Sequence, residues 1–152
     1  MKFLKLSMLA LITVLAIALT GCGGESSSSS TDLGSPDDFV GVWEWTTSEG
    51  DADASVTTEE IAELKANGLT VKMIICADNT VVYDSMGDID NGKWSTSNGT
   101  HINFEFPSGE MNGHLEDGVL KAFFSNGDET YALTNEVVPD TAADYVSSNP
   151  TS

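Results

Sequence analysis

The stretch His101-Ile102-Asn103-Phe104-Glu105-Phe106 shows most clearly how this chain folds. Apolar and polar residues alternate along it, so Ile102, Phe104 and Phe106 share one face of a β-strand and the polar residues share the other. A strand with one apolar and one polar face is typical of an antiparallel sheet that covers a core on one side. Pro107-Ser108-Gly109 follows directly and predicts a turn into a neighbouring strand.

Similar runs of β-type residues, separated by turn residues, extend over most of the chain. Asn-Gly and Asp-Gly pairs in the separators favour the positive φ angles that tight hairpins require. Short strands joined by hairpins pair with their sequence neighbours, and closure removes exposed strand edges. We therefore predict an all-β fold, an antiparallel up-and-down meander barrel of about eight short strands. The predicted strands are residues 39–47, 69–76, 80–84, 92–95, 101–106, 110–115, 119–124 and 129–134, with one turn at Asp90-Asn91-Gly92.

One helix is predicted between the first and second strands. Thr57 and Glu60 have the spacing of a capping box, in which each side chain binds the backbone N–H of the other residue. Ile61 and Leu64 form the apolar stripe, and Asn67-Gly68 ends the helix.

The first 22 residues have the layout of an export signal. Lys2 and Lys5 precede an apolar run over 6–19, which is short for a membrane-spanning helix. The run ends in Leu19-Thr20-Gly21-Cys22, which resembles the lipobox of bacterial lipoproteins. The resemblance implies removal of residues 1–21 and attachment of a diacylglyceryl group to Cys22. Two acyl chains hold a protein stably on a bilayer.

The residues around the lipobox indicate where the protein is located. Small residues before Cys22 disfavour the alternative of an uncleaved transmembrane anchor. In bacterial lipoproteins an Asp after the cysteine is an inner-membrane retention signal, whereas this chain has Gly23. We expect an extracytoplasmic protein, anchored on the outer face of a Gram-positive cell membrane or in a Gram-negative outer membrane. Residues 22–38, rich in Ser and Gly, predict a flexible tether, and residues 135–152 a polar, mobile tail.

The charge of the chain excludes one class of partner. The sequence has 24 acidic residues, six lysines and no arginine, a net charge of −18. Loss of residues 1–21 removes two lysines and no acid, which leaves −20. We expect no nucleic-acid binding, because phosphate neutralisation needs Lys and Arg. The expected partners are the lipid bilayer, through Cys22, and a small hydrophobic ligand; we expect a monomer without a cofactor.

The predicted domain, residues 39–134, resembles the small lipocalin-like domains of bacterial lipoproteins. The resemblance depends on Gly41-Val42-Trp43, which looks like the G-x-W motif that opens calycin barrels, and on its repeat Gly92-Lys93-Trp94. Asp78-Asn79-Thr80 and the Glu116-Asp117-Gly118 turn also fit. The chain departs from full lipocalins because it lacks the late arginine that packs over the first-strand tryptophan.

The resemblance implies a barrel that binds a small ligand inside. Short strands favour a small or filled cavity, because an interior of eight strands is just wide enough for side chains or one small ligand. The residues expected to line the interior or a ligand pocket are Trp43, Ile102, Phe104, Phe106, Leu120 and Phe124.

Two groups of residues are candidates for metal binding. Asp84, Asp88 and Asp90 are close in sequence and could share calcium, as could Glu49 with Asp51 and Asp53, but solvated turns are the simpler interpretation. His101 and His114 are predicted on the polar faces of neighbouring strands and, with Glu105, could bind zinc; two surface histidines are the simpler interpretation.

No motif predicts catalysis. The chain has no nucleophile elbow, phosphate loop or HExxH motif. Cys76 has no cysteine to pair with once Cys22 is acylated, and we interpret it as a small apolar strand residue. Trp94 is the tryptophan expected to be most exposed, and an exposed strand tryptophan could stack on a sugar.

We therefore predict a non-enzymatic, membrane-anchored lipocalin-like lipoprotein. It would bind a small hydrophobic ligand or act as a surface interaction module. The alternative is a calcium- or carbohydrate-binding accessory protein.

Overall fold

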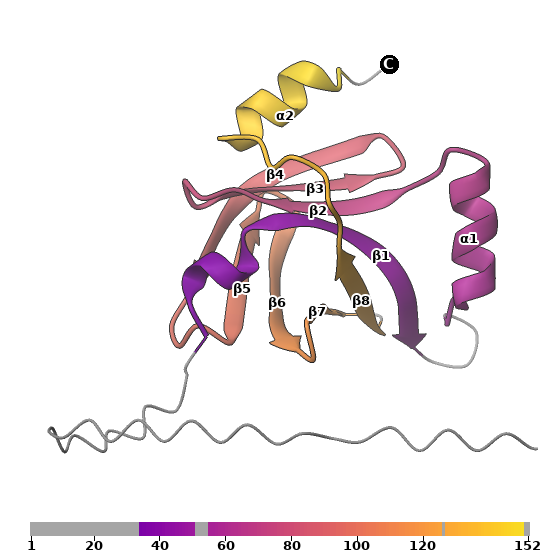
Figure 1. Ribbon diagram of the computed structural model, residues 1–152, viewed down its shortest axis with the longest axis horizontal. Helices are drawn as coiled ribbons and strands as arrows, with labels where there is room; N and C mark the ends of the chain where they lie inside the picture. Colours follow the sequence, from indigo (N-terminus) through magenta and orange to yellow (C-terminus); the bar gives the residue numbers. More distant parts are fainter. Residues whose placement is uncertain (1–33, 51–54, 126, 151–152) are drawn as a thin grey trace, which may run out of the picture. The chain divides into compact units, whose positions relative to one another are not determined.

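The structure, a computed structural model, describes residues 34–50, 55–125 and 127–150. The signal, the lipobox with Cys22 and most of the predicted tether lie outside these residues. Eight antiparallel strands pair in sequence order, and the last pairs with the first, so the sheet closes into a barrel (Figure 1). The strands are β1 (Gly41–Gly50), β2 (Val71–Ile75), β3 (Thr80–Ser85), β4 (Asp88–Thr96), β5 (His101–Phe106), β6 (Gly109–Glu116), β7 (Val119–Phe124) and β8 (Gly127–Leu133). The prediction of an antiparallel eight-stranded closed barrel is confirmed.

One predicted turn is wrong. Residues 90–92 lie inside β4, and the β3–β4 hairpin turns at Met86 and Gly87, whose φ angles are 57° and 91°. Two consecutive positive φ angles match the tight hairpin turn that suits the twist of the strands. Gly92 is needed for a different reason: a Cβ there would lie 2.2 Å from the carbonyl oxygen of Glu105 on β5.

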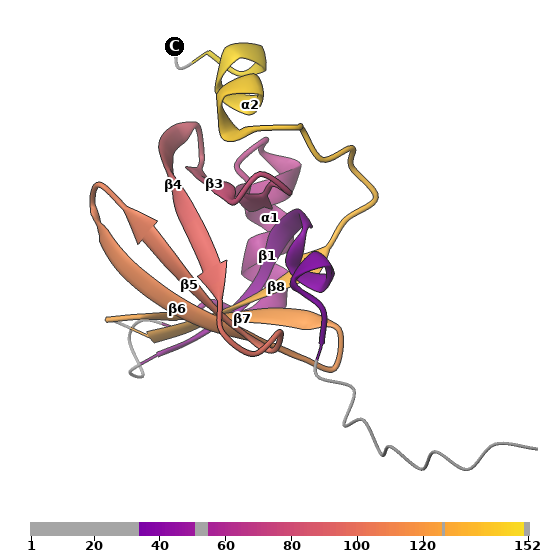
Figure 2. The same ribbon diagram turned by 90° about the vertical axis from the view of Figure 1, so that its left-hand side faces the viewer.

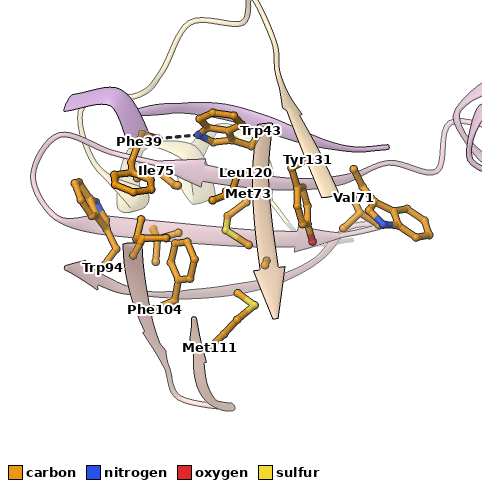
Figure 3. Close-up of a cluster of buried hydrophobic side chains, with 14 of the residues drawn as sticks. Phe39, Trp43, Val71, Met73, Ile75, Trp94, Phe104, Met111, Leu120 and Tyr131 are labelled. Atoms are coloured by element: carbon orange, nitrogen blue, oxygen red, sulfur yellow. Dashed lines mark hydrogen bonds between the residues drawn. The ribbon is translucent and has the colours of Figure 1, made fainter. Parts of the chain in front are cut away.

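One end of the barrel, here called the closed end, is covered by a short 3-10 helix, η1 (Pro36–Phe39). Ser35 and Asp38 cap this helix, so regular structure begins within the segment predicted as tether. The indole of Trp43 donates a 2.8 Å hydrogen bond to the carbonyl oxygen of Phe39 (Figure 3). The indole of Trp94 likewise donates to the carbonyl oxygen of Cys76 at 2.8 Å.

Trp94 is buried, with 5% of its surface exposed, and its ring lies 6.2 Å from that of Phe39. The prediction that Trp94 is the exposed tryptophan is therefore wrong. The Trp94 side chain points into the barrel because the β4–β5 register pairs it with the inward-facing Phe104. A buried Trp94 does not support the hypothesis that this tryptophan stacks on a sugar.

The predicted helix is α1 (Thr58–Ala66), between β1 and β2. Thr57 and Glu60 form the predicted capping box, and Gly68 follows the helix end with φ of 79°. Ile61 is buried in the barrel core, and Lys65 pairs with Glu44 of β1.

A second helix, α2 (Ala142–Ser148), lies in the region expected to be a mobile tail. It packs on the outer side of β3 and β4 (Figure 2). Thr141 and Asp144 form its capping box, with the same spacing as Thr57 and Glu60 of α1. Its Ala142 joins a small hydrophobic cluster outside the barrel with Val42, Ile74, Cys76 and Val82. The helix thus covers outward-facing apolar side chains of β1, β2 and β3.

The main core fills the interior of the barrel. Among the described residues no polar or charged residue is fully buried. Figure 3 shows the core extending from Phe39 and Trp94 on one side to Tyr131 and Val71 on the other. Both hydrophobic clusters consist of residues between positions 39 and 145, so residues 23–152 include the whole of both clusters.

Candidate functional site

The end of the barrel opposite the closed end, here called the mouth, contains a pocket of about 220 Å³. The β3–β4, β5–β6 and β7–β8 hairpins meet there, because each turn of an up-and-down barrel alternates between its two ends. The apolar residues that line the pocket are Tyr83, Phe106, Met111, Phe123 and Phe124. The ring of Tyr83 lies 6.4 Å from that of Phe106 and 6.0 Å from that of Phe124. Three aromatic rings therefore enclose one side of a half-open hollow.

Acidic and hydroxyl groups form the other side of the pocket. Asp90 pairs with Tyr83 across the β3–β4 hairpin, which places the carboxylate beside the ring. Ser108, in the β5–β6 turn, donates a hydrogen bond to Oδ2 of Asp90. Glu110 on β6 also lines the pocket.

Polar groups continue behind Tyr83 into the barrel. The Tyr131 hydroxyl donates to Oε2 of Glu129 on the same strand. Burial raises the pKa of the Glu129 carboxyl, and the hydrogen bond from Tyr131 opposes this shift. Burial also raises the pKa of Tyr83; the charge of Glu129 adds to this shift, and hydrogen bonding with Tyr131 and Ser85 opposes it. Because Tyr83 also lines the pocket, this inner group is connected to the mouth.

The Trp45 indole adds an unsatisfied donor to the same interior. Trp45 is 9% exposed and lies opposite Tyr131 in the β1–β8 pairing. Its Nε1 has no hydrogen-bond partner within the described part of the chain. A β-bulge after Trp45 leaves Thr46 without a partner residue in the ladder and brings Ser48 opposite Glu129. The bulge is thus where β1 changes from an apolar inner face to a polar one.

The predicted interior residues fall into two groups. Trp43, Ile102, Phe104 and Leu120 are fully or almost fully buried in the core. Phe106 and Phe124 are half-buried and line the pocket. The interior is therefore filled by side chains toward the closed end and hollow at the mouth.

The residues that the sequence analysis missed are Tyr83, Met111, Glu129 and Tyr131. Met111 stands in a run that alternates as the other strands do, so counting its inward residues would have found it. Tyr83 follows Val81 and Val82, which face opposite sides of the sheet, so alternation does not show which way this tyrosine points. Nothing in the sequence indicates that Glu129 faces the interior, because a charged residue on a strand of an antiparallel barrel is normally expected to face solvent.

The three candidate calcium ligands Asp84, Asp88 and Asp90 are not brought together on one face. Asp84 lies on the outer face of β3, where the Tyr145 hydroxyl of α2 donates to its Oδ2 at 2.7 Å. Asp90 lies on the opposite face, beside Tyr83, and Asp88 begins β4 opposite Ser85. Asp51 and Asp53 of the second acidic group lie outside the described residues. Within the described residues, no three His, Cys, Asp or Glu side chains are grouped as metal ligands.

The two histidines do meet. His101 and His114 are directly opposite in the β5–β6 register, with ring centroids 5.9 Å apart. Phe123 of β7 stacks on His114 at 5.2 Å. Glu105 lies four residues along the strand, opposite Glu110, so it does not complete a zinc site with the histidines.

Cys76 is a buried free cysteine in the cluster under α2. Burial raises the pKa of its thiol, and hydrogen bonding with Thr80 opposes the shift. A protonated, covered thiol is a poor nucleophile.

No family model matches the chain, and the curated proteins and solved structures gave no significant match. Among the described residues, no helix has the length and apolar character needed to span a bilayer.

Proposed function

We propose that this protein is a membrane-anchored, extracytoplasmic, lipocalin-like lipoprotein that binds a small hydrophobic ligand at the mouth of its barrel and catalyses no reaction. The pocket at the mouth supports the binding role most directly. Its wall of three aromatic rings and Met111 is partly open to solvent, whereas the core toward the closed end consists of buried side chains. Ligand pockets combine such apolar walls with a few placed polar groups.

The lipocalin-like assignment is supported by the order of features along the chain. A Gly41-Val42-Trp43 strand follows a capped 3-10 helix, a helix separates β1 from β2, and a meander of hairpins closes the barrel. The Trp43 ring packs at the closed end, away from the pocket.

Binding can be tested with a neutral fluorescent hydrophobe, N-phenyl-1-naphthylamine, and residues 23–152. We expect saturable fluorescence enhancement that weakens at least tenfold in Phe124→Ala, because the variant removes one aromatic wall of the pocket. The matched control is Leu133→Ala, which removes an exposed apolar side chain at the other end of β8. Circular dichroism establishes that both variants are folded. Equal binding by both variants, or none by the wild type, would contradict the proposal.

The anchor is proposed from the lipobox, and its test uses both cysteines of the chain. Cys22→Ser should abolish incorporation of labelled palmitate in bacteria and release the protein from the membrane fraction. Cys76→Ala is the control, because Cys76 is buried in the fold and should leave labelling intact. A Cys22→Ser protein that is still trimmed and membrane-bound would overturn this part of the proposal.

A further inference from the structure

We infer that the ligand of the mouth is a small organic cation, an ammonium group on an aromatic or short aliphatic body. This inference rests on the proposed function and specifies that the ligand carries a positive charge. It is carried by the charges around the pocket, by the arrangement of the aromatic rings and by the size of the pocket.

The charges that reach the pocket are all negative. The Asp90 carboxylate lies beside Tyr83 in the pocket, and Glu129 lies behind Tyr83, close enough for its charge to act on the Tyr83 hydroxyl. Glu110 lines the rim from the outer face of β6, where it lies opposite Glu105. No basic side chain among the described residues lines the pocket. A fatty acid or another anion would therefore bring a carboxylate toward like charges without a partner, which disfavours the obvious ligand class of an apolar barrel.

The lysines of the mature chain are occupied elsewhere. Lys65, Lys72 and Lys121 form ion pairs with Glu44, Glu136 and Glu116. Lys93 is exposed and precedes the inward-facing Trp94, so it points away from the interior. The acids of the mouth are thus not neutralised by the protein, and a bound cation would do so.

The aromatic wall suits a cation as well as an apolar body. The ring centroid of Tyr83 lies 6.4 Å from that of Phe106, with 58° between the ring planes. It lies 6.0 Å from that of Phe124, with 47° between the planes. Tilted rings present faces from different directions, and ring faces attract ammonium groups. Ser108 donates to Oδ2 of Asp90, which fixes the carboxylate and leaves Oδ1 as a further acceptor for an N–H donor.

The volume limits the ligand to a small molecule. About 220 Å³ is below the ~300–1,000 Å³ of pockets that hold drug-sized ligands. One aromatic ring with a short amine chain fits a pocket of this volume. The probes are therefore 2-phenylethylammonium, neutral 2-phenylethanol and anionic 3-phenylpropanoate, which share a ring and differ in the charge of the head group.

The experiment is an NMR titration of isotope-labelled residues 23–152 with each probe. We expect shifts confined to amides of the mouth, such as those of Tyr83, Met111 and Phe124. The cation should bind at least tenfold more tightly than the alcohol, and the anion should bind most weakly. Asp90→Asn should lower the affinity for the cation about tenfold and leave that for the alcohol unchanged. Asp117→Asn is the control, with the same change of charge at the closed end, in a left-handed turn position that Asn tolerates.

The outcomes separate this inference from the proposed function. Equal affinity for cation and alcohol at the mouth, or no loss in Asp90→Asn, overturns the positive charge and leaves a hydrophobic pocket. If none of the three probes shifts the amide signals of the mouth, both proposals are overturned. Loss of cation binding in Asp117→Asn as well as in Asp90→Asn would show a net-charge effect and also overturn the inference.

Discussion

Trp43 and Phe39 are joined by a 2.8 Å hydrogen bond from the indole nitrogen to the main-chain carbonyl oxygen, which attaches η1 to the first strand of the barrel. Phe39 is fully buried and Trp43 is 2% exposed, so neither partner has water as an alternative. A buried carbonyl that loses its donor costs about 1–3 kcal/mol.

Trp43→Phe keeps most of the ring and removes this donor. We expect the free energy of unfolding of residues 23–152 to fall by about 1–3 kcal/mol, measured by urea denaturation. Trp43→Ala should cost more, about 3–5 kcal/mol, because it also leaves a cavity. Val137→Ala, at a position that is 92% exposed, is the control and should change stability by less than about 0.5 kcal/mol. A Trp43→Phe variant as stable as this control would show that the hydrogen bond contributes nothing.

Gly92 should tolerate no side chain. An Ala Cβ would lie 2.2 Å from the Glu105 carbonyl oxygen, and backbone atoms cannot move away as a flexible side chain can. We expect Gly92→Ala to lower the free energy of unfolding by about 1–3 kcal/mol or more. Ser95→Ala on the same strand is exposed and should be nearly neutral. If Gly92 were a turn residue, as its Asn-Gly sequence indicates, Ala would instead leave the β4–β5 pairing unchanged in hydrogen exchange.

Glu129 should make the protein less stable as pH rises. Burial raises the pKa of this carboxyl above its unfolded value, so folding favours the protonated form. Its contribution is fully present below the ordinary Glu pKa and is lost as pH rises through the higher pKa of the folded state. Glu129→Gln, which can still accept from Tyr131, should therefore raise the melting temperature at pH 7 and have little effect near pH 3.5.

Asp128→Asn is the control for that experiment, because it removes the same charge from an exposed neighbour. Residues 23–152, with a net charge of −20, gain some stability from any lost acid through reduced self-repulsion. Equal gains at pH 7 from both variants would mean that burial of Glu129 has no effect of its own.

Tyr145 should control access to Cys76. Its hydroxyl donates to Asp84 at 2.7 Å and holds α2 over the cluster that contains the thiol. Tyr145→Phe loses about 1 kcal/mol of this attachment, so transient opening of α2 should increase several-fold. The measurement is the rate of Cys76 modification by a thiol reagent in residues 23–152. Tyr83→Phe, inside the barrel, should leave that rate unchanged, and an unchanged rate in Tyr145→Phe would show that α2 does not cover the thiol.

The sequence predicts the barrel well because strand alternation is a local property. In β5 and β7 the inward residues can be counted directly, and Ile102, Phe104 and Leu120 are buried as expected. The position of α1 is also local, since Thr57 and Glu60 mark its start within four residues.

The wrong predictions concern residues whose structure depends on contacts with residues distant in the sequence. Asn91-Gly92 has the composition of a turn, but the close approach of β5 makes the glycine a strand residue. Trp94 lies in a short, polar run, and its burial depends on Phe39 and Cys76, which are remote in sequence. The pocket depends on residues from three hairpins, so no single stretch predicts it.

The β1–β8 ladder has a consequence for folding kinetics. Short turns join each pair of consecutive strands from β2 to β8, and α1 lies between β1 and β2. In contrast, the Thr46 hydroxyl of β1 donates to the carbonyl oxygen of Thr130 in β8, which is 84 residues away along the chain. Closing so long a loop is entropically costly until the intervening hairpins have formed. We therefore expect the first and last strands to join late, after the transition state. Substitutions in this seam should then accelerate unfolding and leave the rate of folding nearly unchanged.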